Sequence, residues 1–235
     1  METQNTAICA KQITKMYKLY QKPQDRLKEA LGLTRKKLYK ENYALKGIDL
    51  AIKQGETVGI IGTNGSGKST ILKIINQIVD ADAGSMRLGT NVTIGYYDQE
   101  HQVLNMDKTL FDELQDTYPD MDNTAIRNVL AAFLFTGDDV FKRIKDLSGG
   151  ERGRVSLAKL MLSGANFLIF DEPTNHLDME SITSVNDGMT KFKGNILFTS
   201  HDHQLTQTVA NRIIDIRTDK VIDREVTYNE YLGIE

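Results

Sequence analysis

Residues 62–70, GTNGSGKST, combine glycines, hydroxyl side chains and one lysine in a spacing that suits phosphate binding. They stand between the mainly apolar run ETVGII and a segment with apolar residues at helical spacing. In such a turn the backbone N–H groups converge on phosphate oxygens, the following helix adds a positive N-terminus, and Lys68 adds a full charge. The predicted phosphate contacts are Gly62, Thr63, Asn64, Gly65, Ser66, Gly67, Lys68, Ser69 and Thr70, with Ser69 also a ligand of Mg²⁺.

Two adjacent carboxylates, Asp171 and Glu172, follow the apolar run NFLIF. Successive side chains of a strand point in opposite directions, so the two acids cannot share one role. We expect Asp171 to hold Mg²⁺ through water and Glu172 to reach further and polarise the attacking water. The pair therefore predicts hydrolysis of a nucleotide held at the phosphate loop.

Gln99 and His201 are each ambiguous alone, because a single Gln is usually a surface residue and a single His usually has a structural role. His201, however, directly follows the apolar run NILFTS, at the sheet edge where α/β folds bind ligands. We expect His201 to contact the γ-phosphate and Gln99 to reach Mg²⁺ or the water. The predicted catalytic residues are Lys68, Gln99, Glu172 and His201, and the predicted metal ligands are Ser69, Gln99 and Asp171.

A second glycine pair, in LSGGERGRVS, stands where a helix N-terminus would bind an anion. One phosphate loop and one carboxylate pair imply one nucleotide per chain, so this second anion site lacks a phosphate of its own. We therefore predict that Ser148, Gly149 and Gly150 bind the nucleotide held by another subunit. Two or three hydrogen bonds to phosphate, each worth about 1.5 kcal/mol, would make ATP a strong link between subunits.

Short apolar runs alternate with helical patterns along the chain, which predicts an α/β fold with a mainly parallel sheet of the P-loop type. Before the first core strand, residues 7–20 and 44–56 are predicted antiparallel strands, and PQDRLKEALG between them is a predicted amphipathic helix. RIIDIR and KVIDREV predict a terminal hairpin. The predicted core spans residues 1–100 and 147–235, with a helical domain, residues 101–146, inserted.

The net charge of −3 is unevenly distributed. Residues 11–46 hold eleven Lys or Arg against three Asp or Glu, a balance of +8, so the rest of the chain sums to −11. A basic segment of this kind could meet anionic lipid headgroups or nucleic acid, or could be a solvated loop. No apolar run of membrane-spanning length and no N-terminal signal segment occurs, so a cytoplasmic location is expected.

GTNGSGKST, Gln99, LSGGE, FLIFDEP, NHLD and His201, in this order, resemble the ATP-binding cassette (ABC) ATPases. The resemblance covers nearly the whole chain. It implies that Tyr17 stacks on adenine, that residues 175–178 communicate across a dimer, and that ATP with Mg²⁺ is held between two cassettes packed head to tail. The partner would be a second copy of this chain or another nucleotide-binding domain.

Within that family the two parts of the chain resemble different lineages. Residues 1–80 resemble the ATPase subunits of polysaccharide and teichoic acid exporters, whereas residues 83–235 resemble the second cassette of ABC-F proteins. We interpret the chain as a natural or engineered fusion with a junction near residues 79–84; an unfamiliar ABC subfamily is the alternative.

Three coupled processes remain open at this stage. An exporter subunit would pair with a transmembrane permease and lie on the inner face of the membrane. An ABC-F-like factor would act on the ribosome, but normally needs a second cassette and a helical linker. The third alternative is an ATPase without a coupled partner. Direct readout of DNA sequence is not expected.

Overall fold

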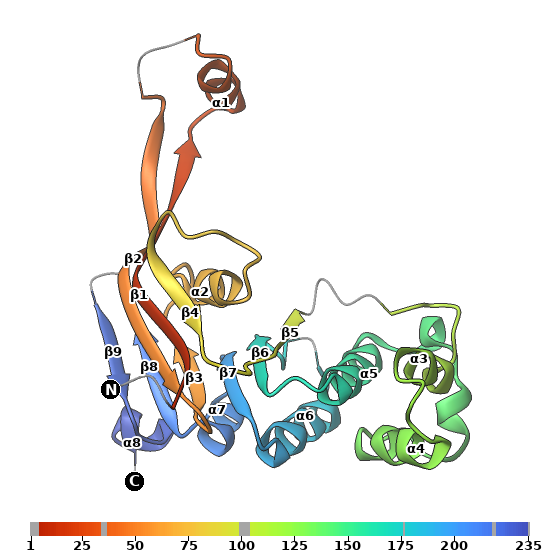
Figure 1. Ribbon diagram of the computed structural model, residues 1–235. Coiled ribbons are helices and arrows are strands. Elements are labelled where there is room, and N and C mark those ends of the chain that lie inside the picture. The colour runs from red at the N-terminus through yellow and green to blue at the C-terminus, as the bar shows by residue number, and fades with distance from the viewer. Residues whose placement is uncertain (1–4, 34–36, 99–103, 176, 218–219, 235) are drawn as a thin grey trace.

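Two β-sheets organise the chain in the computed structural model, which describes residues 5–33, 37–98, 104–175, 177–217 and 220–234 (Figure 1). The smaller sheet is antiparallel and has the order β2-β1-β4. Its strands are β1 (Thr6–Tyr20), β2 (Tyr39–Lys53) and β4 (Ala83–Leu88). The predicted antiparallel pair at the start of the chain is therefore confirmed, and β4 is a strand that the sequence patterns did not indicate.

The larger sheet has six strands in the order β5-β6-β7-β3-β8-β9. Its strands are β3 (Thr57–Ile61), β5 (Ile94–Asp98), β6 (Phe167–Asp171), β7 (Asn195–Thr199), β8 (Arg212–Ile216) and β9 (Val221–Arg224). All neighbours are parallel except β8 and β9, which form the predicted terminal hairpin. The apolar runs predicted as core strands occupy its centre, so the mainly parallel α/β fold is confirmed.

Helices cover both faces of this sheet and form an extension at one end. They are α1 (Pro23–Ala30), α2 (Lys68–Ile75), α3 (Leu110–Thr117), α4 (Asn123–Ala132), α5 (Gly149–Leu162), α6 (Met179–Lys191), α7 (His203–Val209) and α8 (Tyr228–Leu232). Two short 3₁₀ helices, Gly137–Phe141 and Ile144–Asp146, lie between α4 and α5.

Two apolar clusters hold these layers together. One joins the small sheet and α2 to one face of the large sheet through residues such as Ile8, Leu45 and Ile71. The other packs α3 to α7 and includes Phe170 and Phe198 of the large sheet. Since alternate residues of β6 and β7 enter opposite clusters, both faces of these strands are buried.

Between residues 104 and 146 the described elements are helical, as predicted, apart from one isolated β-bridge. Besides apolar packing, two polar contacts join this segment to Lys159 of α5. The Tyr118 hydroxyl donates to the Lys159 carbonyl at 2.6 Å, and Lys159 Nζ lies 2.6 Å from Glu113 Oε1. The inserted position of this segment agrees with the expectation, whereas the division into two domains stays a prediction.

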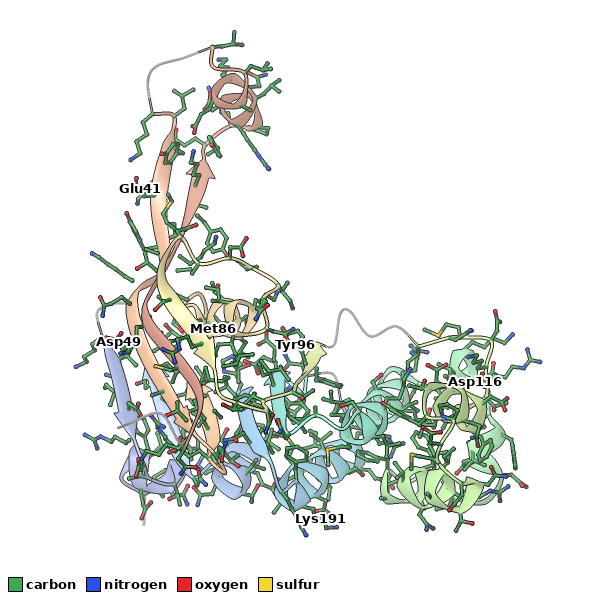
Figure 2. All side chains as sticks on the ribbon, in the orientation of Figure 1. Glu41, Asp49, Met86, Tyr96, Asp116 and Lys191 are labelled. Carbon is green, nitrogen blue, oxygen red and sulfur yellow. The ribbon has the colours of Figure 1, made fainter. Side chains whose placement is uncertain are left out.

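Strands β1 and β2 continue together beyond the small sheet, because β4 pairs with β1 only as far as Thr14. We call this projecting part, described residues 16–33 and 37–43, the arm. It carries α1 at its end, away from the body of the molecule (Figure 1). Glu41 lies on the arm, whereas Asp49 of the same strand lies against the body (Figure 2). The predicted helix in this segment is confirmed, but none of its residues is buried.

Candidate functional site: the carboxyl edge of the parallel sheet

The phosphate-binding loop connects the end of β3 to the start of α2, as its sequence predicts. Gly67 has φ of +96°, and a Cβ there would lie 2.2 Å from the Ala44 carbonyl oxygen. Gly62 has φ of +149°, and its Cβ would lie 2.4 Å from the Ile216 oxygen. A Cβ on Gly65, by contrast, would meet nothing within 4 Å. Two glycines are thus required by close backbone packing, while the third leaves the loop open on one side.

Three charged or titratable side chains converge beside this loop from three elements. Lys68 is in the first turn of α2, Glu172 follows β6, and His201 follows β7. Lys68 Nζ lies 3.6 Å from Glu172 Oε1 and 3.3 Å from His201 Nε2. His201 Nε2 is 3.4 Å from Glu172 Oε1, and the His201 backbone N–H donates to Glu172 Oε2 at 3.2 Å.

Burial strengthens the electrostatic interactions in this cluster. The Lys68 side chain is 8 % exposed and that of Glu172 is 17 % exposed, whereas His201 is 57 % exposed. Charges removed from water interact more strongly than surface charges. A phosphate near Lys68 would therefore be held by a nearly buried ammonium group, with the Glu172 carboxylate directly beside it.

Asp171 faces a different set of groups from its neighbour Glu172. Its Oδ1 accepts hydrogen bonds from Ser69 Oγ at 2.9 Å and from Thr199 Oγ1 at 2.8 Å. The side-chain oxygens of Ser69 and Asp171 are the kind of ligand that Mg²⁺ takes when waters and substrate phosphates complete its shell. The described residues contain no group of three or more His, Cys, Asp or Glu that could hold a metal by themselves. The donor set therefore fits Mg²⁺ bound together with a nucleotide.

A pocket of about 560 Å³ contains the open side of the loop. It is lined by Tyr17, Asn42, Ala44, Asn64, Gly65, Gly67, Lys68, Ser69, Thr70, Glu172, Asn175 and His201. Tyr17 of β1 is 39 % exposed and paired in register with Asn42 of β2. An aromatic ring and the Lys68 ammonium group in one pocket suit a nucleotide, since a ring can stack on a base and a cation can bind phosphate.

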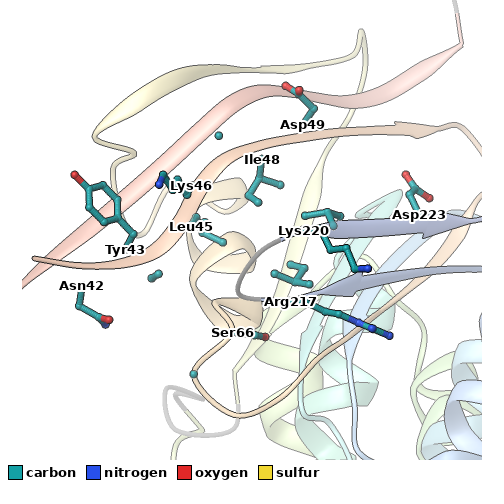
Figure 3. A pocket seen from close by; sticks show the side chains of 15 residues that line it. Asn42, Tyr43, Leu45, Lys46, Ile48, Asp49, Ser66, Arg217, Lys220 and Asp223 are labelled. Atoms are coloured by element: carbon teal, nitrogen blue, oxygen red, sulfur yellow. The ribbon is translucent and has the colours of Figure 1, made fainter.

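A larger cavity of about 670 Å³ lies beside β2 (Figure 3). It reaches the loop through Gly65 and Ser66, but Lys68, Glu172 and His201 do not line it. Its two carboxylates already have partners, because Asp49 accepts from Gln12 and Asp223 from Arg212. The groups able to act on a phosphate meet in the smaller pocket instead.

Ser148 begins helix α5, and a capping box fixes its geometry. Ser148 Oγ accepts from the Glu151 N–H at 3.2 Å, and the Ser148 N–H donates to Glu151 Oε2 at 2.7 Å. A Cβ on Gly149 would meet nothing within 4 Å, so this residue is open to an incoming group. Ser148, Gly149 and Gly150 do not line the pocket that contains Lys68.

The loop before α6 packs against the start of α5. Asp178 caps α6 by accepting from the Ser181 N–H at 2.8 Å, and this bond is the main cause that lowers the pKa of Asp178. A Cβ on Gly150 would lie 3.3 Å from Ser181 Oγ and 3.5 Å from Asp178 Oδ2. The absence of a side chain on Gly150 therefore allows the residues that cap α6 to approach the start of α5 closely.

The structure brings most of the predicted site residues to one pocket or beside it, while their roles stay predictions. Gly62 and Thr63 of the loop lie on a neighbouring cavity, and Ser66 on the larger one. Gln99 lies outside the described residues. Sequence reasoning missed Asn42 and Thr199. Thr199 stands two positions before His201 on a buried strand, which was the available signal.

Residues 45–175 match the family described as ABC transporter. The chain belongs to the family of ABC transporter ATPases. It is 41 % identical over 212 residues to the probable ATP-binding protein YbiT of Escherichia coli O157:H7, covering 88 % of this chain. It is 36 % identical over 201 residues to the energy-dependent translational throttle protein EttA of Escherichia coli K12, covering 83 % of this chain.

The chain spans 40 % of the length of YbiT and 36 % of EttA. The ABC fold is also found in the dimeric structure of a post-hydrolysis state of the ATP-binding cassette MJ0796 bound to ADP and Pi. That match has a TM-score of 0.72 at 21 % identity and covers 93 % of this chain and 98 % of the other. The P-loop ABC fold predicted from the motifs is therefore confirmed.

The proposed junction between two ABC lineages stays a prediction. Residues 83–235 comprise 235 − 83 + 1 = 153 residues, fewer than the 212 aligned with YbiT. The likeness to that relative therefore extends into the part before the proposed junction. In the part of the chain that the structure describes, no helix is long and apolar enough to cross a membrane.

Proposed function

We propose that this cassette binds ATP with Mg²⁺ and hydrolyses it when two copies associate head to tail. The observation that carries the proposal is the convergence of Lys68, Glu172 and His201 beside the open side of the phosphate loop, within 3.6 Å of one another. A base, a cation and a further hydrogen-bonding group are then available around one transferring phosphoryl group.

Each of these residues has a distinct role. Glu172 orients a water molecule and accepts its proton, while Lys68 holds the β- and γ-phosphate oxygens. His201 contacts the γ-phosphate, and the Tyr17 ring stacks on the adenine. Ser69 and Asp171 would hold Mg²⁺, which neutralises phosphate charge during transfer. Gln99 is proposed as a further contact to the metal or the water.

The second copy supplies the groups that the pocket lacks. The residues Ser148 to Gly150 do not line the pocket that contains Lys68, yet they begin a helix whose N-terminus favours an anion, and Ser148 and Gly149 are exposed there. In the proposed dimer they face the γ-phosphate bound by the partner. Loss of that phosphate on hydrolysis removes these contacts and weakens the association.

Glu172→Gln tests the catalytic assignment. The amide keeps the size of the side chain but cannot accept a proton, so phosphate release should fall at least about 100-fold while ATP binding persists. Glu180→Gln, on an exposed residue of α6, is the control and should hydrolyse ATP at the parental rate. Hydrolysis by Glu172→Gln at the parental rate would refute the role of Glu172.

Ser148→Arg tests the head-to-tail arrangement. In the Glu172→Gln background, the added bulk should prevent the formation of ATP-dependent dimers while the monomer still binds nucleotide. Analytical ultracentrifugation measures the dimer fraction. Loss of nucleotide binding by the monomer would contradict the assignment of Ser148 to the partner's nucleotide.

For the coupled process, the arm favours attachment to a membrane surface and hence a permease partner. Leu27 and Leu31 are 61 % and 62 % exposed on α1, and basic residues, including Lys22 and Arg26, lie beside them. An exposed apolar stripe with cations suits anionic lipid headgroups. The relative named a translational throttle protein supports the ribosome as the alternative.

Co-sedimentation distinguishes these partners. The full chain should sediment with vesicles that contain anionic lipid and not with ribosomes. The double change Leu27→Asp and Leu31→Asp should remove this binding, whereas Met179→Asp, at a 77 % exposed residue of α6, should not. Sedimentation with ribosomes alone would favour the ABC-F-like function, and with neither would favour an ATPase without a coupled partner.

A further inference from the structure

Thr199, the last residue of β7, contacts the Asp171 carboxylate and the Glu172 backbone, and it has no role in the reaction as proposed above. It is fully buried, with 0 % exposure. Its hydroxyl donates to Asp171 Oδ1 at 2.8 Å and accepts from the Glu172 backbone N–H at 3.0 Å. One side chain therefore contacts the proposed metal ligand and the backbone of the proposed base.

The chemistry of the partners fixes the direction of both hydrogen bonds. An ionised carboxylate only accepts, and a backbone N–H only donates, so the single hydroxyl proton of Thr199 must point to Asp171. The hydroxyl oxygen is then free to accept from Glu172. Neither hydrogen bond of the Thr199 hydroxyl can therefore change direction.

The backbone of Glu172 has a special need for support. Its φ is +50°, in the left-handed region that residues other than glycine rarely adopt. Its N–H is held from the same residue twice, by Thr199 Oγ1 and by the Thr199 carbonyl oxygen at 3.2 Å. An unusual conformation persists only when its surroundings hold it, and Thr199 supplies two of the contacts that do so.

We propose that Thr199 is a positioning residue that sets Asp171 for the metal and Glu172 for the water at the same time. The inference rests on the proposed ATPase function. It differs from a purely structural role in one respect: if Thr199 only filled space in the strand, valine would replace it without loss, because valine has nearly the same shape and favours strands.

Thr199→Val, Thr199→Ser and Thr206→Val test this proposal. Thr206 is the matched control, since it is also a buried threonine, 1 % exposed. Its hydroxyl donates to the Asp202 carbonyl at 2.8 Å and not to Asp171. The readouts are kcat and KM for ATP, the Mg²⁺ concentration that half-saturates binding of a fluorescent ATP analogue, and the melting temperature.

Thr199→Val should lower kcat about 10- to 100-fold, as loss of a group that orients a metal ligand does elsewhere, and should raise the Mg²⁺ requirement about 10-fold. Its KM for ATP should change less than about 2-fold, because the loop and Tyr17 are untouched. Thr199→Ser keeps the hydroxyl and should restore both properties. Thr206→Val should match the parent protein.

A parental kcat and Mg²⁺ requirement in Thr199→Val would overturn the proposal, and so would a Thr199→Ser variant as defective as Thr199→Val. If the parent protein itself failed to hydrolyse ATP, the proposed function would fail. The Mg²⁺ dependence of analogue binding would still decide the role of Thr199 toward Asp171.

Discussion

The two ends of the β1–β2 hairpin share one hydrogen-bonded ladder but differ in their surroundings. At the base, Ile8 pairs with Ile52, and both are fully buried between the sheets. On the arm, Tyr20 pairs with Tyr39, while Leu19 is 51 % exposed and Tyr43 is 49 % exposed. Both ends are antiparallel pairs, but the base contains register shifts and a third strand, β4, and only the base adds apolar burial.

This difference separates folding from surface function within one pair of strands. Burial of apolar area is the main stabilising contribution, so the base should fix the fold and the arm should contribute little. The base also contacts the phosphate loop, where the Ala44 carbonyl excludes any side chain at Gly67. The arm is free to carry exposed leucines because no part of the core depends on them.

The largest expected contrast comes from leucine truncation at the two ends. Leu45→Ala, at a 2 % exposed residue of the base, should lower the free energy of unfolding by about 3 to 4 kcal/mol through lost burial and the cavity left behind. Leu31→Ala, at 62 % exposed, should change it by less than about 0.5 kcal/mol. Urea denaturation measures both, and equal losses would break the comparison.

A smaller effect on the free energy of unfolding is expected from Arg212, whose hydrogen bond to Ala51 joins β8 to the base. Arg212 donates to the Ala51 carbonyl at 2.9 Å and to carboxylates of Glu56 and Asp223, and these acids raise the pKa of the guanidinium. Arg212→Ala should cost about 2 kcal/mol, because the 15 % exposed Glu56 carboxylate and the other acceptors lose a charged donor that is itself only 9 % exposed. Lys37→Ala, which removes an exposed pair with Glu41 on the arm, should leave the urea midpoint unchanged. A shift for Lys37→Ala as large as that for Arg212→Ala would contradict this view.

The smallest effect is the pH dependence of stability that arises from Asp82, which lies where the arm meets the body. The Met16 N–H, and then Lys15, lower the pKa of Asp82. A lowered folded pKa gives stability that is present above the unfolded value, near 4, and is lost as pH falls through the folded value. Since Asp82 is 45 % exposed, Asp82→Asn should cost less than about 1 kcal/mol at pH 7, and the cost should decrease as the pH falls through the folded pKa of Asp82. Asp25→Asn on α1 is the control and should leave the free energy of unfolding unchanged. Urea denaturation at several pH values measures both variants, and a cost of Asp82→Asn that does not vary with pH would contradict the prediction.

The sequence predicted the parts of the fold whose residue pattern has a single physical explanation. Apolar runs such as NFLIF and NILFTS can only be buried, and they became β6 and β7. The strand β4 escaped prediction because five of its six residues are exposed, so no apolar pattern marks it. Its strand conformation comes from pairing with β1, which a local pattern cannot reveal.

The residues of the candidate site likewise divide into those that a local sequence pattern identifies and those that only the neighbouring strand explains. Glycine spacing and adjacent carboxylates identified Lys68 and Glu172, because few other functions need those residue types together. Thr199 was missed because threonine is common in strands, and its two hydrogen bonds join β7 to the end of β6. The left-handed backbone of Glu172 likewise depends on that neighbouring strand and on nothing in its own sequence.

Helix α5 joins two distant parts of the molecule through its length alone. Its fourteen residues span about 21 Å, with Ser148 at one end and Lys159, held by Tyr118 and Glu113, near the other. A helix resists compression and bending over this distance. Displacement of α3 by a bound protein would therefore shift the start of α5, which is the turn proposed above to meet a partner's phosphate.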